Sequence, residues 1–396
     1  MLRDEAGGVA GKSSALLFRP SERQASQICP SLSFRPKAAD TSGCGKRKNG
    51  RQDDELRTKN RTVDQKKRVL VSLNPNAGAR SGQTLVDTLG DRLVGRGFQV
   101  ETITDIDHLA AEAEAALASG QLRAVISAGG DGTAALIANR TPQGTPIAVF
   151  PLGTENLLAK YLEVTADIDC LVDTVSHGKM LTLDAGEANG RLFLLMVGCG
   201  FDADVVRRLH SERTGHIHHL SYARPILDSI WNYEYPELRV YCDTDDTSGE
   251  DSDESDSLAI SARWVFVGNL PRYAGGLRIL PDADGNDGFL DLCTFKEGSI
   301  WNGLRYLSGV IMGQHQTWED CTTKRTRCLR IESEAGEVPF QMDGDPGGVL
   351  PVAIRILPDR LTLLVPHGLA RETSTTHDTA TDQPSTVLSS KSPLAT

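Results

Sequence analysis

Apolar runs of strand length alternate with amphipathic stretches between residues 68 and 177. Residues 68–73, 124–128 and 147–150 form nearly uninterrupted apolar runs, and the stretches between them repeat apolar residues at helical spacing. Strands that alternate with helices predict a parallel sheet covered by helices on both faces. Ligands of such sheets bind beyond the carboxyl ends of the strands. We therefore expect the functional residues of this region to follow its strands directly.

After about Met180 the pattern changes to a period of two. Short alternating runs follow one another with a few helical stretches between them, and this predicts an antiparallel sandwich or barrel. The predicted strands are 182–187, 192–197, 238–242, 264–267, 289–295, 328–331, 338–342, 352–357 and 361–365. The predicted helices are 202–209, 220–231 and 299–312.

The chain is predicted to consist of four parts. Residues 1–66 form a disordered arm, 67–180 an α/β domain, 181–366 a β-rich domain, and 367–396 a disordered tail. Within the β-rich domain, residues 243–257 contain eight acids and almost no apolar side chain, which is typical of a solvated loop.

Charge is distributed unevenly along the chain. The net charge is −11, whereas residues 1–68 have 16 Lys and Arg against 8 Asp and Glu. The remainder is therefore strongly acidic, which argues against a body that binds nucleic acid. No run of about 18 apolar residues occurs, so the sequence predicts no transmembrane helix.

A glycine-rich turn follows the apolar run 124–128. Gly129, Gly130, Asp131 and Gly132 precede Thr133, where the pattern predicts a helix. Glycines let the backbone approach an anion closely, and N–H groups at a helix N-terminus point toward it. A carboxylate beside a polyphosphate needs a divalent cation between them, and oxygen ligands suit Mg2+. The turn indicates a nucleotide site that also binds magnesium; the alternative is a structural turn in which Asp131 caps the helix.

Two further turns repeat this arrangement. Residues 152–156 also join a strand to a helix, and Thr154 can cap that helix or contact a phosphate. Residues 74–82, which begin with Asn74, follow the first strand. Three turns suited to anions are thus expected along one edge of the predicted sheet.

Two acidic turns lie in the β-rich domain. Asp282, Asp284 and Asp287 are close together, and carbonyl oxygens between them can help to hold a hard cation. Asp343 and Asp345 bracket a glycine after a predicted strand, and such a carboxylate pair can supply a general base and a metal ligand. An ordinary turn between strands is the alternative at both places.

In this order, the three turns and the late Asp-Gly-Asp resemble the diacylglycerol kinase catalytic-domain superfamily. That superfamily includes soluble bacterial lipid kinases and the sphingosine and ceramide kinases. The Gly-Gly-Asp-Gly-Thr turn alone is shared with NAD kinases and 6-phosphofructokinases, whereas the Gly-Thr-Glu-Asn turn and the late Asp-Gly-Asp point to lipid kinases. The resemblance covers about residues 68–366. It implies an N-terminal three-layer α/β domain like that of NAD kinases and phosphofructokinases, a C-terminal antiparallel β-sandwich, and ATP between them.

The resemblance also implies roles for individual residues. The nucleotide phosphates and Mg2+ would be bound by Asn74, Gly129, Gly130, Asp131, Gly132, Thr133, Thr154 and Asn156. Asp343 would take the proton from the acceptor hydroxyl, with Asp131 as the rival base. Asp345 would help to hold the catalytic metal, where the family usually has the longer Glu. Asp284 or Asp287 would hold a structural Mg2+ with neighbouring carbonyl groups.

The implied activity is transfer of the γ-phosphoryl group of ATP to the hydroxyl of a membrane lipid, diacylglycerol or a sphingoid lipid, with Mg2+. The chain would be cytoplasmic and peripheral at a membrane surface, would bind no nucleic acid, and leaves room for a homodimer. The alternatives are an NAD kinase-like phosphotransferase and a non-catalytic nucleotide or lipid-binding module. Trp301, Leu304, Leu307 and Ile311 of the predicted helix 299–312 can form a wall for an acyl chain, although packing in the core is the favoured role.

Overall fold

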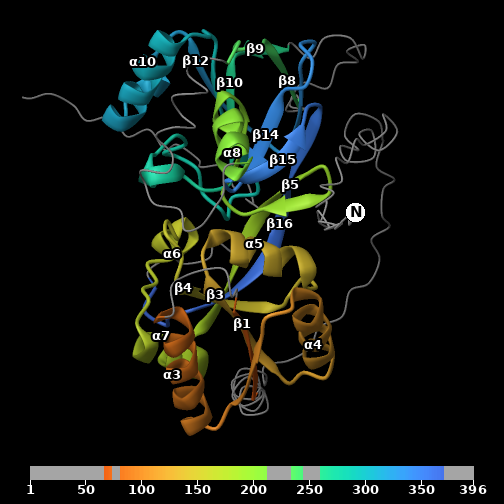
Figure 1. Cartoon of the computed structure of the whole chain (residues 1–396), viewed down its shortest axis with the longest axis vertical. Helices are drawn as coiled ribbons and strands as arrows, with labels where there is room; N and C mark the ends of the chain where they lie inside the picture. The colour runs from red at the N-terminus through yellow and green to blue at the C-terminus, as the bar shows by residue number, and fades with distance from the viewer. Residues whose placement is uncertain (1–66, 74–80, 212–232, 244–258, 370–396) are drawn as a thin grey trace, which may run out of the picture.

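The computed structural model describes residues 67–73, 81–211, 233–243 and 259–369 (Figure 1). Its strands are β1 Arg68–Leu73, β2 Gln99–Ile103, β3 Leu122–Gly129, β4 Pro146–Pro151, β5 Lys179–Ala188, β6 Arg191–Phe193, β7 Met196–Gly200, β8 Leu238–Cys242, β9 Ile260–Ala262, β10 Trp264–Gly268, β11 Leu290–Phe295, β12 Cys321–Thr326, β13 Cys328–Glu332, β14 Pro339–Met342, β15 Asp345–Val349 and β16 Val352–Val365. Its helices are α3 Ser81–Gly95, α4 Ile106–Ala118, α5 Asp131–Arg140, α6 Leu157–Tyr161, α7 Ile168–His177, α8 Phe201–Ser211 and α10 Ile300–Met312, with 3-10 turns η3 Ala274–Gly276 and η4 His315–Thr317. None of the described helices combines the length and the apolar sequence needed to cross a bilayer.

Several predicted segments lie outside the described residues. They are the basic arm 1–66, the helix 220–231, nearly all of the acidic loop 243–257 and the tail from residue 370. Asn74 and most of the 74–82 turn belong to the same group.

The N-terminal half is a parallel sheet between two layers of helices. Its strands lie in the order β2-β1-β3-β4, and every neighbouring pair is parallel. Helices α3 and α7 pack on one face through residues such as Leu89 and Val175, and α4 and α5 cover the other through Leu109 and Ile137. The three-layer α/β prediction is confirmed.

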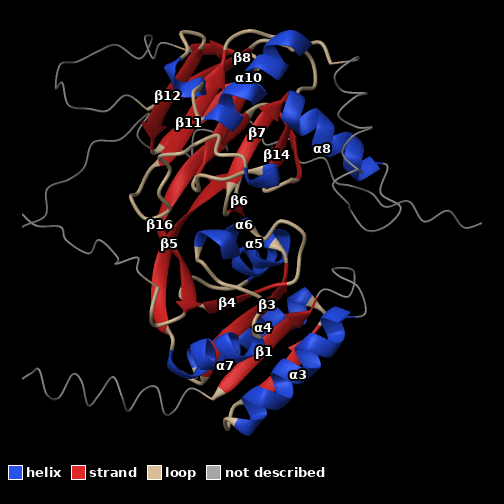
Figure 2. Cartoon of the chain, turned by 90° about the vertical axis from the view of Figure 1, so that its left-hand side faces the viewer, coloured by secondary structure: helices blue, strands red, loops and turns tan. Residues whose placement is uncertain are grey.

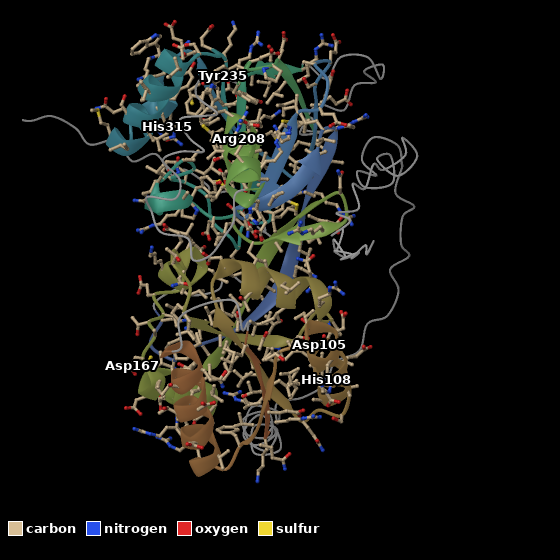
Figure 3. The ribbon with its side chains drawn as sticks, viewed as in Figure 1. Asp105, His108, Asp167, Arg208, Tyr235 and His315 are labelled. Atoms are coloured by element: carbon tan, nitrogen blue, oxygen red, sulfur yellow. The ribbon has the colours of Figure 1, made fainter. Side chains whose placement is uncertain are left out.

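Short polar residues fix where two of these helices begin. The carboxylate of Asp105 accepts a hydrogen bond from the backbone N–H of His108 at 2.7 Å, and Asp167 accepts one from the N–H of Cys170 at 2.7 Å. Figure 3 labels both caps at the edges of the α/β half. Each carboxylate satisfies one of the N–H groups that a helix N-terminus leaves without a partner.

The C-terminal half is an antiparallel sandwich. A six-stranded sheet, β12-β11-β10-β7-β14-β15, faces a layer formed by β13, β8, β9 and the first part of β16 (Figure 2). Side chains from both layers, including Phe193, Val265, Leu329 and Ile354, fill the space between them. The β-sandwich prediction is confirmed.

One long strand joins the two halves. The runs 352–357 and 361–365, predicted as separate strands, are the single strand β16, with a register shift between Leu357 and Leu361 where it pairs with β5. The first part of β16 pairs antiparallel with β13, and its end pairs parallel with β4. Because β5 accompanies β16 along both parts, the two domains share a continuous sheet (Figure 2).

Other details of the strand pattern also differ from expectation. The predicted strand 192–197 is split into β6 and β7, and the strands β9, β12 and β15 were not predicted. β15 has the sequence Asp-Pro-Gly-Gly-Val, whose composition is typical of a turn. It forms a strand because β14 pairs with it, so tertiary context overrides local preference here.

Candidate active site

The two glycine turns of the α/β half lie in direct contact. The N–H of Leu152 donates to the carbonyl of Gly129 at 3.0 Å, so the β4–α6 turn is hydrogen-bonded to the end of β3. A Cβ atom added at Gly153 would lie 2.5 Å from the Cα atom of Gly130, and one added at Gly129 would overlap the side chain of Thr133. Neither position has room for a side chain. The sequence therefore needs glycine here for close approach of two backbones.

Asp131 ties the two turns together. It is the first residue of α5, yet its carboxylate accepts hydrogen bonds from the N–H groups of Leu157, at 2.8 Å, and Leu158, at 2.9 Å. The alternative that Asp131 acts as a helix cap is thus correct for α6 and not for its own helix. Burial raises the pKa of Asp131. The two N–H groups and the positive charge of Lys160 lower it, but the effect of burial is larger.

Asn156, rather than Thr154, forms the start of α6. It occupies the N-cap position with φ 49° and ψ 52°, in the left-handed region that Asn tolerates better than most residues. Its side-chain NH2 donates to the carbonyl of Gly153 at 2.7 Å, and its side-chain oxygen accepts the N–H of Gly153 at 3.0 Å. Of the two roles expected for Thr154, capping the helix belongs to Asn156 instead, and Thr154 is exposed. Its hydroxyl is therefore accessible to a ligand.

A tight hairpin presents the late Asp-Gly-Asp. Met342 pairs with Asp345 across β14 and β15, which leaves Asp343 and Gly344 as the two turn residues. Their φ angles are 51° and 85°. A type I′ turn requires positive φ at both positions and strongly favours Asp-Gly. The residues that the sequence marked as a possible active-site turn also satisfy a strict backbone requirement.

The carboxylate of Asp343 clamps the connection between β6 and β7. It accepts the N–H groups of Leu194, Leu195 and Met196 at 2.7, 2.8 and 3.0 Å. Burial raises the pKa of Asp343 to about 6 although the three N–H groups lower it, and the negative charge of Asp131 raises it further.

Asp345 faces the first glycine turn from the other domain. A Cβ atom added at Gly132 would lie 3.6 Å from its Oδ2 atom. Its Oδ1 atom lies 3.3 Å from Nε2 of His210, which α8 brings to the site. The Asp345 side chain is 43% exposed, so it remains accessible to a ligand. Asp131, Asp343 and Asp345 thus converge where the two domains meet.

These carboxylates offer the hard oxygen ligands that Mg2+ prefers. Within the described residues, no three His, Cys, Asp or Glu side chains are grouped closely enough to hold a metal ion by themselves. Mg2+ in nucleotide sites is usually bound by one or two carboxylates together with substrate phosphates. The donor set therefore fits a metal that arrives with ATP.

The residues predicted to hold a structural Mg2+ have protein partners. Asp284 accepts a hydrogen bond from the hydroxyl of Tyr161 at 3.0 Å, and Asp287 forms an ion pair with Arg325. Nearby, burial raises the pKa of Asp291 to about 6, and the negative charge of Asp287 contributes to the increase. A metal site at Asp284 and Asp287 stays a prediction.

Three residues that the sequence did not single out contact the Asp343–Asp345 hairpin or its support. One of them is His210, which lies beside Asp345. Asp202 and Gln341 were not considered, although the Nε2 group of Gln341 donates to Asp202 at 3.0 Å and its Oε1 atom accepts the N–H of Gly344 at 2.8 Å. The position of Asp202 just after the strand β7 was a usable signal. Nothing in the sequence around Gln341 or His210 marks either residue as part of the site.

Comparison with known proteins identifies the family. The diacylglycerol kinase catalytic domain matches residues 68–188, and the YegS C-terminal NAD kinase beta sandwich-like domain matches residues 195–365. The chain belongs to the diacylglycerol kinase family. As an enzyme of this family it is a lipid kinase that uses ATP.

Relatives of this lipid kinase align over most of their length. The diacylglycerol kinase of Bacillus subtilis is 25% identical over 296 residues, which cover 72% of this chain and 92% of the relative. The diacylglycerol kinase of Staphylococcus epidermidis is 23% identical over 322 residues, which cover 80% of this chain and 98% of the relative. A crystal structure of a diacylglycerol kinase from Bacillus anthracis has a TM-score of 0.54 at 22% identity, covering 76% of this chain and 97% of that one. This structural likeness supports the fold.

Contact between the glycine turns leads to a prediction. Gly153→Ala would force the backbones of Gly153 and Gly130 apart, because its Cβ atom would lie 2.5 Å from the Cα atom of Gly130. Backbone N–H groups of the turn would then no longer reach the phosphates, and a hydrogen bond to a charged group contributes about 1.5–3 kcal/mol. We therefore expect ATP affinity, measured by calorimetry, to fall by at least about tenfold. Gly90→Ala is the control, since its Cβ atom meets nothing closer than 4.0 Å inside α3. Equal ATP affinity in the two variants would contradict the packing argument.

Proposed function

We propose that this kinase transfers the γ-phosphoryl group of ATP to the hydroxyl of a membrane lipid, diacylglycerol or a sphingoid lipid, with Mg2+. The observation that carries the proposal is an apolar cavity connected by hydrogen bonds to the Asp343 hairpin. The cavity has a volume of about 280 Å³ and lies among α8, α10 and the strands β10 and β11. Its walls include Phe201, Trp264, Phe266, Phe295 and Leu304. Such walls suit a hydrocarbon chain rather than a soluble nucleotide.

One acid interrupts the apolar wall. Asp202 lines the cavity, and its Oδ2 atom accepts hydrogen bonds from the hydroxyl of Tyr273 at 3.1 Å and from Gln341 at 3.0 Å. Gln341 in turn accepts the N–H of Gly344 at 2.8 Å, next to Asp343. A lipid whose chain occupies the cavity would therefore place its polar end toward the hairpin that carries the proposed base.

The remaining roles follow from phosphoryl-transfer chemistry, in which positioning and charge neutralisation dominate. The glycine turns 129–133 and 152–156 hold the phosphates through backbone N–H groups. Asp131 and Asp345 would hold Mg2+, which would supply positive charge to offset that of the phosphate oxygens. Asp343 accepts the proton of the lipid hydroxyl, and Asp131 remains its rival for this role. A non-catalytic binding module would have no need for three acids at the boundary between the two domains.

Removal of either central charge should abolish most activity. We expect Asp131→Asn and Asp343→Asn to lower kcat at least roughly 10²–10³-fold, because each loses a preorganised electrostatic contact. Phosphoryl transfer from labelled ATP measures the change. Thermal unfolding serves as the control for folding, since both carboxylates also accept backbone hydrogen bonds. Near-normal turnover in both folded variants would refute the assignment.

The pKa of Asp343 predicts that the rate of phosphoryl transfer falls at acidic pH. A base acts in its deprotonated form, so a pKa of about 6 leaves Asp343 active at pH 7 and progressively protonated as pH falls through 6. Single-turnover transfer should be roughly tenfold slower at pH 5 than at pH 7. ATP affinity must be measured over the same range, because phosphate groups also titrate near pH 6. A rate that stays constant down to pH 5 would argue against Asp343 as the base.

A panel of acceptors tests the function itself. Labelled ATP is offered with diacylglycerol, sphingosine, ceramide or phosphatidylglycerol in mixed micelles, and separately with NAD. We expect at least one lipid to be labelled well above the level given by Asp131→Asn, which controls for contaminating kinases. Labelling of NAD in place of every lipid would overturn the proposal in favour of the NAD kinase alternative.

A further inference from the structure

Helix α10 lies at the margin of the sandwich (Figure 1), and one of its faces is apolar and exposed. Its exposed large hydrophobic side chains are Trp301, Leu304, Leu307, Ile311 and Met312, and Trp301 is 77% exposed. Elsewhere in the described residues, the large hydrophobic side chains with comparable exposure lie singly, at Val94, Leu136 and Met180. The expectation that Trp301, Leu304, Leu307 and Ile311 pack in the core is therefore wrong. A cluster of this kind marks an interaction surface.

The exposed face belongs to a helix that is firmly held. Its opposite side buries Tyr306 and Val310. Arg305 forms two hydrogen bonds of 2.8 Å with Asp320. Just after the helix, the Nε2 atom of His315 lies 2.9 Å from the carbonyl oxygen of Ile279, and Figure 3 shows this histidine beneath α10. The apolar face is thus a fixed feature of the fold and not the result of a loosely attached helix.

The same face is continuous with the apolar cavity. Leu304 and Leu307 are about half exposed, and both also line the cavity. Across the cavity, the segment 273–279 contributes Tyr273, Ala274 and Leu277 to the lining. A molecule that leaves the cavity past Leu304 and Leu307 therefore meets the exposed apolar face directly.

Positive charge flanks the cavity wall opposite α10. Arg272 directly precedes the 273–279 segment, Arg278 lies within it, and both are exposed. Neither forms an ion pair with another described residue. Apolar side chains beside cationic ones characterise helices and loops that lie in the interface of an anionic bilayer.

We propose that the outer face of α10, together with Arg272 and Arg278, is the surface by which this kinase docks on an anionic lipid bilayer. Trp301, Ile311 and Met312 enter the headgroup region while the two arginines contact lipid phosphates. The cavity then opens toward the bilayer, so that a lipid can enter without crossing water. This proposal rests on the proposed function in taking a membrane lipid as the acceptor.

A second copy of the chain is the other candidate occupant. A stable dimer usually buries about 20–30 residues on each side, whereas the apolar face comprises five side chains of one 13-residue helix. A bilayer requires no matching partner surface, and the neighbouring arginines complement its charge. The observations favour the bilayer.

Vesicle flotation with purified full-length protein tests the proposal. Vesicles of phosphatidylglycerol with phosphatidylcholine, and of phosphatidylcholine alone, are compared for wild type and for Trp301→Glu with Ile311→Glu. We expect the double variant to bind the anionic vesicles at least tenfold more weakly. Val94→Glu with Met180→Glu, which places the same charges at exposed apolar positions outside α10, should bind like wild type. Arg272→Glu with Arg278→Glu should lose the preference for anionic vesicles.

The outcomes separate docking from catalysis, because flotation requires no turnover. Unchanged vesicle binding by the Trp301 and Ile311 variant would overturn the docking surface even if the enzyme phosphorylates lipid. Failure of every lipid in the acceptor panel, with vesicle binding still dependent on α10, would refute the proposed function and leave the surface standing. A wild-type dimer that this variant dissociates, with no vesicle binding by wild type, would assign the face to a second copy and overturn the proposal.

Discussion

The shared sheet formed by β5 and β16 is the constraint on which the site depends. β16 pairs parallel with β4 at its end and antiparallel with β13 at its beginning, so a single strand belongs to both domains. The glycine turns extend from one domain and the Asp343 hairpin from the other. Because backbone hydrogen bonds fix the register of β16 with both, the carboxylates are positioned relative to the turns without a flexible linker between them. In this way sheet topology, rather than local sequence, brings Asp345 close to the turn that contains Asp131.

Placing several acids together at the boundary between the two domains has an electrostatic cost. Burial raises the pKa values of Asp131 and Asp343, and the charge of Asp131 adds to the increase at Asp343. Backbone N–H groups offset part of this cost, since five of them donate to the two carboxylates. A divalent cation would offset the rest. The same hydrogen bonds that fix the side chains for catalysis therefore also make each acid part of the fold.

Features that depend on local chemistry could be predicted from the sequence. The glycine turns, the three-layer and sandwich architecture and the Asp-Gly hairpin follow from backbone requirements and hydrophobic periodicity that nearby residues express. Features that depend on distant partners could not. Asp131 caps α6 instead of α5, and His210 of the helix α8 approaches Asp345 of the strand β15. This segment is a strand only because β14 pairs with it. The outward orientation of Trp301 was missed for the same reason, because helical periodicity shows that a face is apolar but not which face meets the core.

The central claim is that ATP binds between the two domains, along the edge formed by the two glycine turns, with its γ-phosphate toward the Asp343–Asp345 hairpin. A crystal structure of the enzyme with Mg2+ and a non-hydrolysable ATP analogue tests this most directly. We predict that the triphosphate contacts backbone N–H groups of residues 129–133 and 152–156, and that the metal contacts Asp131 or Asp345. A nucleotide bound away from these turns, or one whose γ-phosphate points away from Asp343, would contradict the account.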